Sequence, residues 1–166
     1  MAAGLAGSGA AWWRSRADKG DTTSANEVDI WPMRFESPRG GELVLSGMRG
    51  RPLLLNFWAT WCAPCVTELP LLDRFEREQR GRGWQVVGLA VDNREPVIEF
   101  LAKSQVGFAI GLAGMGGVEL SRTMGNAVGA LPFSVVFDRQ GRVMDRRLGI
   151  VRAEDLRRWV EKAGPG

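Results

Sequence analysis

The chain has 166 residues, of which 45% are hydrophobic and 25% charged, and its formal net charge at neutral pH is +3. This length and balance suit one globular domain with its own core, and the scattered basic residues argue against a surface for nucleic acid. His is absent, which excludes imidazole as a catalytic base or as a metal ligand.

The N-terminal segment differs in composition from the rest of the chain. Residues 2–13 are small or apolar and carry no charge before Arg14. A membrane-spanning helix needs roughly 20 apolar residues, so this stretch is too short to span, but its length is typical of an export-signal core. The basic residues expected before such a core are missing, so we interpret it as the remnant of an export signal or membrane anchor, with a disordered tail as the alternative. Polar residues 14–28 indicate a linker, and we expect one domain over residues 30–166 after a segment of residues 1–29.

The first elements predicted in the domain are strands. Two short apolar runs, residues 30–35 and 42–45, are separated by the turn residues 37–41, which predicts a hairpin. Residues 53–58 (LLLNFW) form a nearly continuous apolar run, as expected for a buried central strand.

A helix is predicted next. Leu69, Leu72 and Phe75 recur at helical spacing, and the glycines of residues 81–83 end the pattern. Pro70 lies inside this run, where it should bend the helix.

The middle of the chain continues the alternation of strands and helices. Residues 85–91 (QVVGLAV) predict a second buried strand, and residues 95–103 predict a helix with Val97, Ile98 and Leu101 facing inward.

The last third begins with a glycine-rich stretch. Residues 111–117 hold four glycines, so we expect that this stretch cannot stay in regular structure for long. A short helix is predicted over residues 118–124, a strand hairpin over residues 133–137 and 142–148, and a closing helix over residues 153–162. Alternating strands and helices followed by an antiparallel pair indicate an α/β fold, with a mixed sheet covered on both faces.

The cysteines carry the strongest chemical signal. Cys62 and Cys65 are the only two in the chain, and they open the helix that comes after the central strand. A separation of three residues brings both sulfur atoms to one helical turn, close enough to bond. Free N–H groups and the helix dipole stabilise a thiolate at the helix start, and Pro64 in the first turn loses no hydrogen bond. We therefore expect Cys62 to be the exposed, low-pKa nucleophile and Cys65 the more buried resolving thiol.

Three other interpretations of the pair are weaker. Half of a zinc site is excluded within the chain, because no further Cys or His exists to complete it. A c-type haem site would need His at position 66, which is Val66. Two incidental core cysteines remain possible in principle, but Trp61 and Pro64 in these places argue against them. A redox dithiol that needs neither metal nor cofactor is the best interpretation.

The segment of residues 55–65 (LNFWATWCAPC) resembles the thioredoxin superfamily, and the resemblance runs from about residue 30 to the C-terminus. It implies a thioredoxin-like fold: a central mixed sheet flanked by helices, with an N-terminal hairpin and a helix inserted before the strand that a cis-proline opens. Leu131-Pro132 matches that strand start. The resemblance implies that Pro132 is cis, lies beside the cysteines and helps to hold the partner chain, while Leu131 lines the substrate contact. Substrate-binding roles are also expected for three residues around the cysteines: Trp61, Ala63 and Pro64.

Within the superfamily the chain is similar to the exported, often membrane-anchored TlpA/ResA type. Asn56 stands where thioredoxin places a buried Asp, Glu68 comes three residues after Cys65, and residues 107–130 add an extra helix. This resemblance implies that Glu68 tunes Cys65 or accepts its proton. The alternative for Glu68 is an acidic residue that only favours the helix dipole.

The function expected is dithiol–disulfide exchange with protein thiols and disulfides, supplied with electrons by an upstream dithiol donor. The resemblance favours a reductase in the periplasm, tethered to the inner membrane, with cytochrome c maturation as one such role. A disulfide-forming oxidant remains open, because the dipeptide between the cysteines does not determine the potential. A thiol peroxidase of the peroxiredoxin kind is a second alternative, although Ala59 stands where that family has Thr. A non-catalytic binding module is a third, and the intact cysteine pair argues against it.

Overall fold

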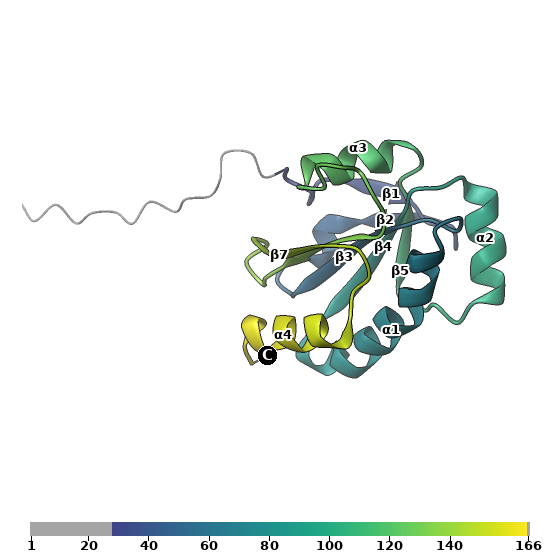
Figure 1. Ribbon diagram of the computed structural model, residues 1–166. Helices are drawn as coiled ribbons and strands as arrows, with labels where there is room; N and C mark the ends of the chain where they lie inside the picture. Colours follow the sequence, from purple (N-terminus) through teal and green to yellow (C-terminus); the bar gives the residue numbers. More distant parts are fainter. Residues whose placement is uncertain (1–27, 166) are drawn as a thin grey trace, which may run out of the picture.

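The computed structural model describes residues 28–165, which form one mixed sheet with helices on both faces (Figure 1). The strands are β1 Arg34–Glu36, β2 Glu42–Val44, β3 Leu53–Trp58, β4 Gln85–Ala90, β5 Ala109–Leu112, β6 Phe133–Phe137 and β7 Val143–Leu148. The helices are α1 Ala63–Gln79, α2 Arg94–Lys103, α3 Gly116–Thr123 and α4 Ala153–Ala163, with short 3-10 turns η1 Leu45–Met48 and η2 Arg80–Arg82.

The sheet has seven strands in the order β2-β1-β5-β4-β3-β6-β7. The central strands β3, β4 and β5 are parallel, and β6 runs antiparallel to β3 with Phe133 opposite Phe57. The carboxyl ends of the parallel strands therefore share one edge of the sheet with the start of β6. Loops from these ends meet there, as is usual for sites on α/β sheets.

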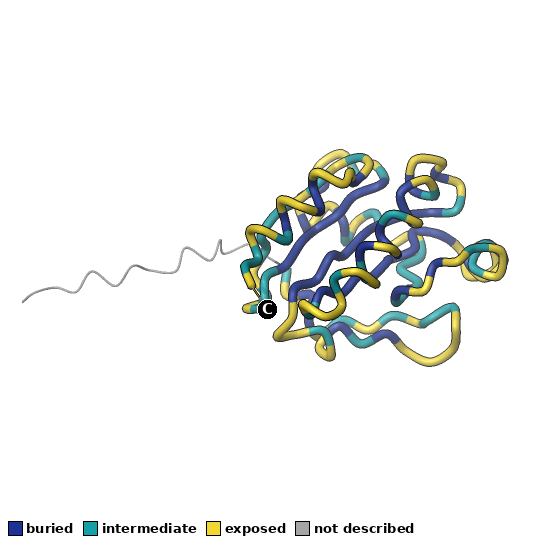
Figure 2. Tube along the Cα trace, turned by 90° about the horizontal axis from the view of Figure 1, so that it is seen from below, coloured by how far each residue is buried: buried dark blue, intermediate teal, exposed yellow. Residues whose placement is uncertain are grey.

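Two cores lie on opposite faces of the sheet, because successive side chains of a strand point to opposite sides. Leu54 and Trp58 of β3 belong to the core under α1, α2 and α4, whereas Leu55 and Phe57 belong to the core on the side of α3. Figure 2 shows the buried strands running between more exposed helices. By the same alternation, Asn56 faces α1, and this places one amide inside an otherwise apolar layer.

The fold class expected from the sequence is confirmed, including the N-terminal hairpin and the helix inserted before β6. Pro70 lies inside α1, as predicted. The interpretation of residues 1–27 as a signal or anchor remnant falls outside the described residues. Among residues 28–165, no helix is long and apolar enough to cross a membrane.

In the middle of the chain, one strand was not predicted and one expectation is wrong. The glycine-rich stretch holds no long regular element, as expected, but Gly111 lies in the unpredicted strand β5 and Gly116 begins α3. A Cβ on Gly111 would lie 2.7 Å from the Cβ of Phe35, so glycine here lets the N-terminal hairpin close against β5. Ile98 does not face inward but is 37% exposed, because α2 turns Val97 toward the core instead.

Candidate active site

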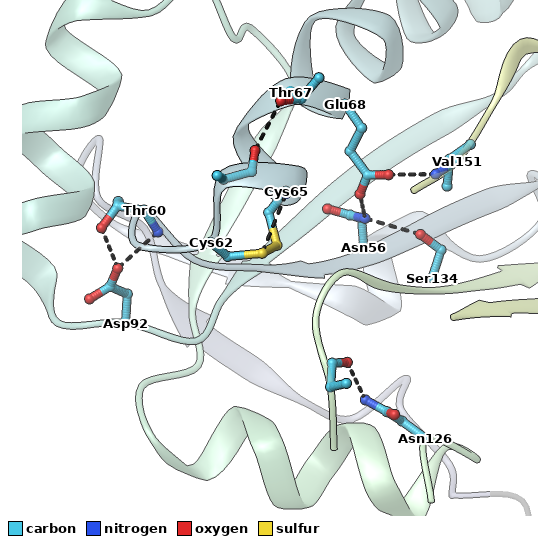
Figure 3. The surroundings of a disulfide bond; sticks show 12 residues. Asn56, Thr60, Cys62, Cys65, Thr67, Glu68, Asp92, Asn126, Ser134 and Val151 are labelled. Atoms are coloured by element: carbon cyan, nitrogen blue, oxygen red, sulfur yellow. Dashed lines mark hydrogen bonds between the residues drawn. A yellow bond between two sulfur atoms is a disulfide. The ribbon is translucent and has the colours of Figure 1, made fainter. Parts of the chain in front are cut away.

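The two cysteines form a disulfide at the point where α1 begins (Figure 3). Their sulfur atoms are 2.07 Å apart, and the Sγ of Cys62, the N-cap residue, accepts the backbone N–H of Cys65 at 3.3 Å. Cys65 is fully buried and Cys62 is 7% exposed. Cys62 is thus the more accessible sulfur, as expected, but in the oxidised protein it is far less exposed than predicted.

The loop that carries Cys62 is held by the carboxylate of Asp92, which follows the neighbouring strand β4. Asp92 lies just beyond the end of β4, and its Oδ2 accepts the backbone N–H of Thr60 at 3.0 Å and the Thr60 hydroxyl at 2.5 Å. Its other oxygen accepts the N–H of Asn93 at 2.8 Å. The signal for this clamp in the sequence is an acidic residue at the end of a parallel strand, beside the cysteine edge.

A buried polar network lies under α1 next to the disulfide. Glu68 Oε1 accepts a hydrogen bond from Asn56 Nδ2 at 2.7 Å, and Glu68 Oε2 accepts the backbone N–H of Val151 at 2.6 Å. Asn56 Nδ2 also donates to the Ser134 hydroxyl at 3.0 Å. The network joins α1 to β3, β6 and the loop after β7. Sequence reasoning identified Glu68 but missed Ser134 and Val151, because both partners come from distant parts of the chain.

Glu68 has a strongly altered acidity. Burial disfavours the carboxylate and raises the pKa of Glu68 from 4.5 to about 7, although the hydrogen bonds from Val151 and Asn56 and the positive charge of Arg147 act in the opposite direction. An acid with this pKa changes its protonation state around neutral pH. It can therefore hold or release a proton one helical turn from Cys65.

The cis peptide bond implied by the resemblance is present between Leu131 and Pro132. Because Phe133 pairs with Phe57, Pro132 lies opposite the end of β3, where the cysteine loop begins. The Pro132 carbonyl accepts the N–H of Gly149, and Leu131 packs against both cores.

The segment before this proline is anchored by a second buried amide, which sequence reasoning missed. Asn126 Nδ2 donates to the Ser121 hydroxyl at 3.0 Å and to the Ala130 carbonyl at 2.8 Å. Asn126 thus ties the inserted helix α3 to the loop that delivers the cis-proline.

Three loops that carry exposed apolar side chains lie before or after the strand ends at this edge of the sheet. Trp61 precedes Cys62 and is 65% exposed, Val128 lies in the loop before β6, and Ile150 lies in the loop after β7. Ala63 and Pro64, between the two cysteines, are also exposed. This edge of the sheet therefore carries exposed apolar side chains as well as the disulfide.

Between residues 28 and 165, no three Cys, Asp or Glu side chains gather as a metal-binding cluster would require. Thiol–disulfide exchange needs only a thiolate, a disulfide and proton acceptors, all of which the cysteine pair and the Glu68 network can supply.

Comparisons with known proteins agree with this chemistry. The family model described as Redoxin matches residues 33–159. The thiol-disulfide oxidoreductase ResA of Geobacillus kaustophilus is 30% identical over 129 residues, covering 76% of this chain and 71% of the relative, and that of Bacillus thuringiensis is 29% identical over 126 residues with the same coverage. A thiol:disulfide interchange protein of the thioredoxin family from Chlorobium tepidum has a solved structure with a TM-score of 0.68 and 25% identity, covering 79% of this chain and 92% of that one. With its bonded Cys62–Cys65 pair at the start of α1, the chain belongs to the redoxin family of the thioredoxin superfamily, as a ResA-like thiol–disulfide oxidoreductase.

Proposed function

We propose that this oxidoreductase is a reductase of protein disulfides outside the cytoplasm. The observation that carries the proposal is the asymmetry of the pair: Cys62 at the helix start is 7% exposed, whereas Cys65 is fully buried one turn from a carboxyl group whose pKa is about 7. Such an arrangement separates a sulfur that attacks the partner from a sulfur that resolves the intermediate.

The reaction begins with the reduced protein. The Cys62 thiolate attacks one sulfur of the substrate disulfide, the substrate S–S bond breaks, and its other sulfur leaves as a thiolate. Cys65 then gives its proton to the Glu68 carboxylate and attacks Cys62 Sγ, which releases the second substrate sulfur as a thiolate. The substrate gains two electrons, and the Cys62–Cys65 disulfide is the oxidised product. An upstream dithiol donor then reduces the pair again.

The remaining site residues have proposed roles in holding the substrate. Pro132 and Leu131 would contact an extended segment of the partner beside the disulfide, and the exposed Trp61, Ala63 and Pro64 would complete the contact surface. Partner strands commonly pair with exposed backbone in this way. No cofactor takes part in these steps.

The direction of electron flow is argued from the surroundings of Cys62. A strong oxidant needs a reduced form that is specifically stabilised, usually through its thiolate. Here the intervening residues Ala63 and Pro64 carry no charge, so the helix start alone stabilises the Cys62 thiolate. An ionised Glu68 would also destabilise a thiolate at Cys65, because the two groups carry like charges. Both features favour a reducing couple.

The cellular setting is part of the same proposal. We assign residues 30–166 to one thioredoxin-like domain on the periplasmic side, with residues 1–29 as the segment that exports or tethers it to the inner membrane. Support comes from the apolar stretch of residues 2–13, whose length is typical of an export-signal core. Cytochrome c maturation, where haem-attaching cysteines must be kept reduced, is the role we assign first.

The test is the reduction potential of the pair, equilibrated against a glutathione series. A value near about −270 mV supports a reductase, whereas a value near about −120 mV would make the protein a disulfide donor and overturn the proposed direction.

Two matched variants test the roles of the cysteines. Cys65→Ser should accumulate a mixed disulfide with an oxidised protein substrate, because no thiol remains to resolve it. Cys62→Ser should form none. Equal trapping by both variants would contradict the assignment of attacking and resolving sulfurs.

A further inference from the structure

Asn56 is a fully buried amide whose hydrogen bonding is incomplete. Its two N–H bonds point to Glu68 Oε1 at 2.7 Å and to Ser134 Oγ at 3.0 Å. Its oxygen Oδ1 is buried and accepts no hydrogen bond from any side chain or backbone group of the described chain. Buried carbonyl oxygens in folded proteins nearly always have a partner, so the orphaned oxygen requires an explanation.

The orientation of the amide suggests what that partner is. Asn56 lies on the face of β3 that α1 covers, together with Leu54 and Trp58, in the same core as Cys65. Because Nδ2 is directed to Glu68 and Ser134, Oδ1 must point the other way. In Figure 3 it points toward the side of the Cys62–Cys65 disulfide.

In the oxidised protein, no group of residues 28–165 donates a hydrogen bond to this oxygen. A disulfide sulfur carries no hydrogen, whereas a reduced cysteine has an S–H that is a weak donor. We propose that Asn56 is a positioning residue whose Oδ1 accepts the S–H of Cys65 in the reduced protein. The proposal rests on the proposed function, in which Cys65 is the resolving thiol. When a dithiol donor supplies two electrons and two protons, the S–S bond breaks and one proton ends on each sulfur. The S–H of Cys65 then donates a hydrogen bond to Asn56 Oδ1.

This contact has two consequences. The hydrogen bond exists only in the reduced state, so it stabilises the dithiol relative to the disulfide. It also connects the Cys65 thiol to Glu68 through one side chain, because the same amide donates to the Glu68 carboxylate. An Asp at this position would lose the donor to Glu68 and place two carboxyl groups at hydrogen-bond distance, where they could not both ionise freely.

The first experiment measures the potential in a background without an ionisable group at position 68. In Glu68→Gln protein, Asn56→Leu should shift the glutathione equilibrium about fivefold toward the disulfide, or about 20 mV for this two-electron couple. Ser134→Ala is the matched control, since it removes the other acceptor of Nδ2 but leaves Oδ1 in place. It should shift the equilibrium less than twofold. An Asn56→Leu effect that vanishes in the Glu68→Gln background would mean that Asn56 acts only through Glu68, and would overturn the proposal.

The second experiment starts from a protein with Asn56 intact, so its first reading does not depend on how an Asn56 variant folds. In Cys62→Ser protein Cys65 is the only thiol, so its infrared S–H stretching band is unambiguous. The band should lie at lower frequency in the folded protein than in the same protein unfolded in urea, and Asn56→Leu should return it to the unfolded frequency. A folded-state band at the frequency of a free thiol, or a lowered band that Asn56→Leu leaves unchanged, would overturn the proposal.

The two proposals fail in distinguishable ways. Wild-type protein with an oxidant's potential would overturn the reductase assignment, yet the S–H band is measured without any substrate and still reports on Asn56. Conversely, an unaltered band leaves disulfide exchange by Cys62 and Cys65 intact.

Discussion

Glu68 in the active-site helix accepts the backbone N–H of Val151, a residue 83 positions later in the chain, at a distance of 2.6 Å. The contact joins α1 to the loop between β7 and α4 through a buried carboxyl group. It also means that the acid beside the cysteines is part of the structural support of the domain. Its protonation state should therefore affect both stability and exchange.

The first prediction concerns Glu68 and the pH dependence of stability. Because burial raises its pKa from 4.5 to about 7, the protonated form is favoured in the folded state. The stabilisation from this group is complete below its unfolded pKa and is lost as the pH rises through about 7, at a cost of about 3 kcal/mol. Urea unfolding at about pH 5 and about pH 9 should show this loss in wild type, and Glu68→Gln should abolish most of it.

Glu78 provides the control for this prediction, because it is an exposed acid on the same helix. Glu78→Gln should keep the wild-type pH dependence. Identical pH profiles for wild type and Glu68→Gln would show that the buried carboxyl group does not control stability.

The second prediction concerns the clamp between Asp92 and the cysteine loop. Asp92→Asn replaces one carboxylate oxygen with an N–H₂ group. This new donor would then face the backbone N–H of either Thr60 or Asn93, which now has no acceptor. We expect a loss of about 1–3 kcal/mol in unfolding free energy, and exchange with a protein disulfide slowed about tenfold as the loop loses its position.

Asp138→Asn separates the two effects. Asp138 accepts two backbone N–H groups in the β6–β7 turn, at the opposite end of β6 from the disulfide. It should lose comparable stability with an unchanged exchange rate. If both variants slow exchange equally, the clamp has no specific role in placing Cys62.

The third prediction concerns Trp61 as a contact for the substrate. Its side chain is 65% exposed, so Trp61→Ala should change the unfolding free energy by no more than about 0.5 kcal/mol. Exposed aromatic residues often anchor partners, so kcat/KM toward a protein disulfide should fall about tenfold, while the reaction with oxidised glutathione stays within about twofold. Ile98→Ala, on the exposed face of α2, should affect neither reaction. An equal loss toward both substrates would place Trp61 in the chemistry rather than in recognition.

The fourth prediction concerns Gly88 in the central strand β4. A Cβ there would lie 2.7 Å from Ile110 Cδ1 and 2.9 Å from Trp58 Nε1. Gly88→Ala should overpack this core. We expect it to lower the free energy of unfolding by about 1–3 kcal/mol and the Tm by about 3–10 °C. Gly47→Ala, where a Cβ meets nothing within 4 Å, is the matched control and should leave the Tm nearly unchanged. A Tm equal to wild type for Gly88→Ala would show that Ile110 and Trp58 move aside freely.

Local pattern explains which elements could be predicted. The run of residues 53–58 and the helical spacing of Leu69, Leu72 and Phe75 are properties of neighbouring residues, and both elements are present. Strand β5 was missed because Gly111 weakens a strand in isolation. Here the lack of a side chain is what admits Phe35 of the hairpin, a contact between residues 76 positions apart that no local pattern encodes.

The sequence by itself indicated the chemistry of the site, because the two cysteines lie three residues apart at a predicted helix start and no further Cys or His could complete a metal site. The resemblance to the superfamily implied the cis bond before Pro132, which is present, and pointed to Glu68. Only the tertiary structure decided what Glu68 and Asn56 contact, since Ser134 and Val151 reach them through the register of β6 on β3 and through the loop after β7. Whether a hydrogen bond forms depends on differences of a few tenths of an ångström in the donor–acceptor distance, and only the packed sheet and helices set distances that finely.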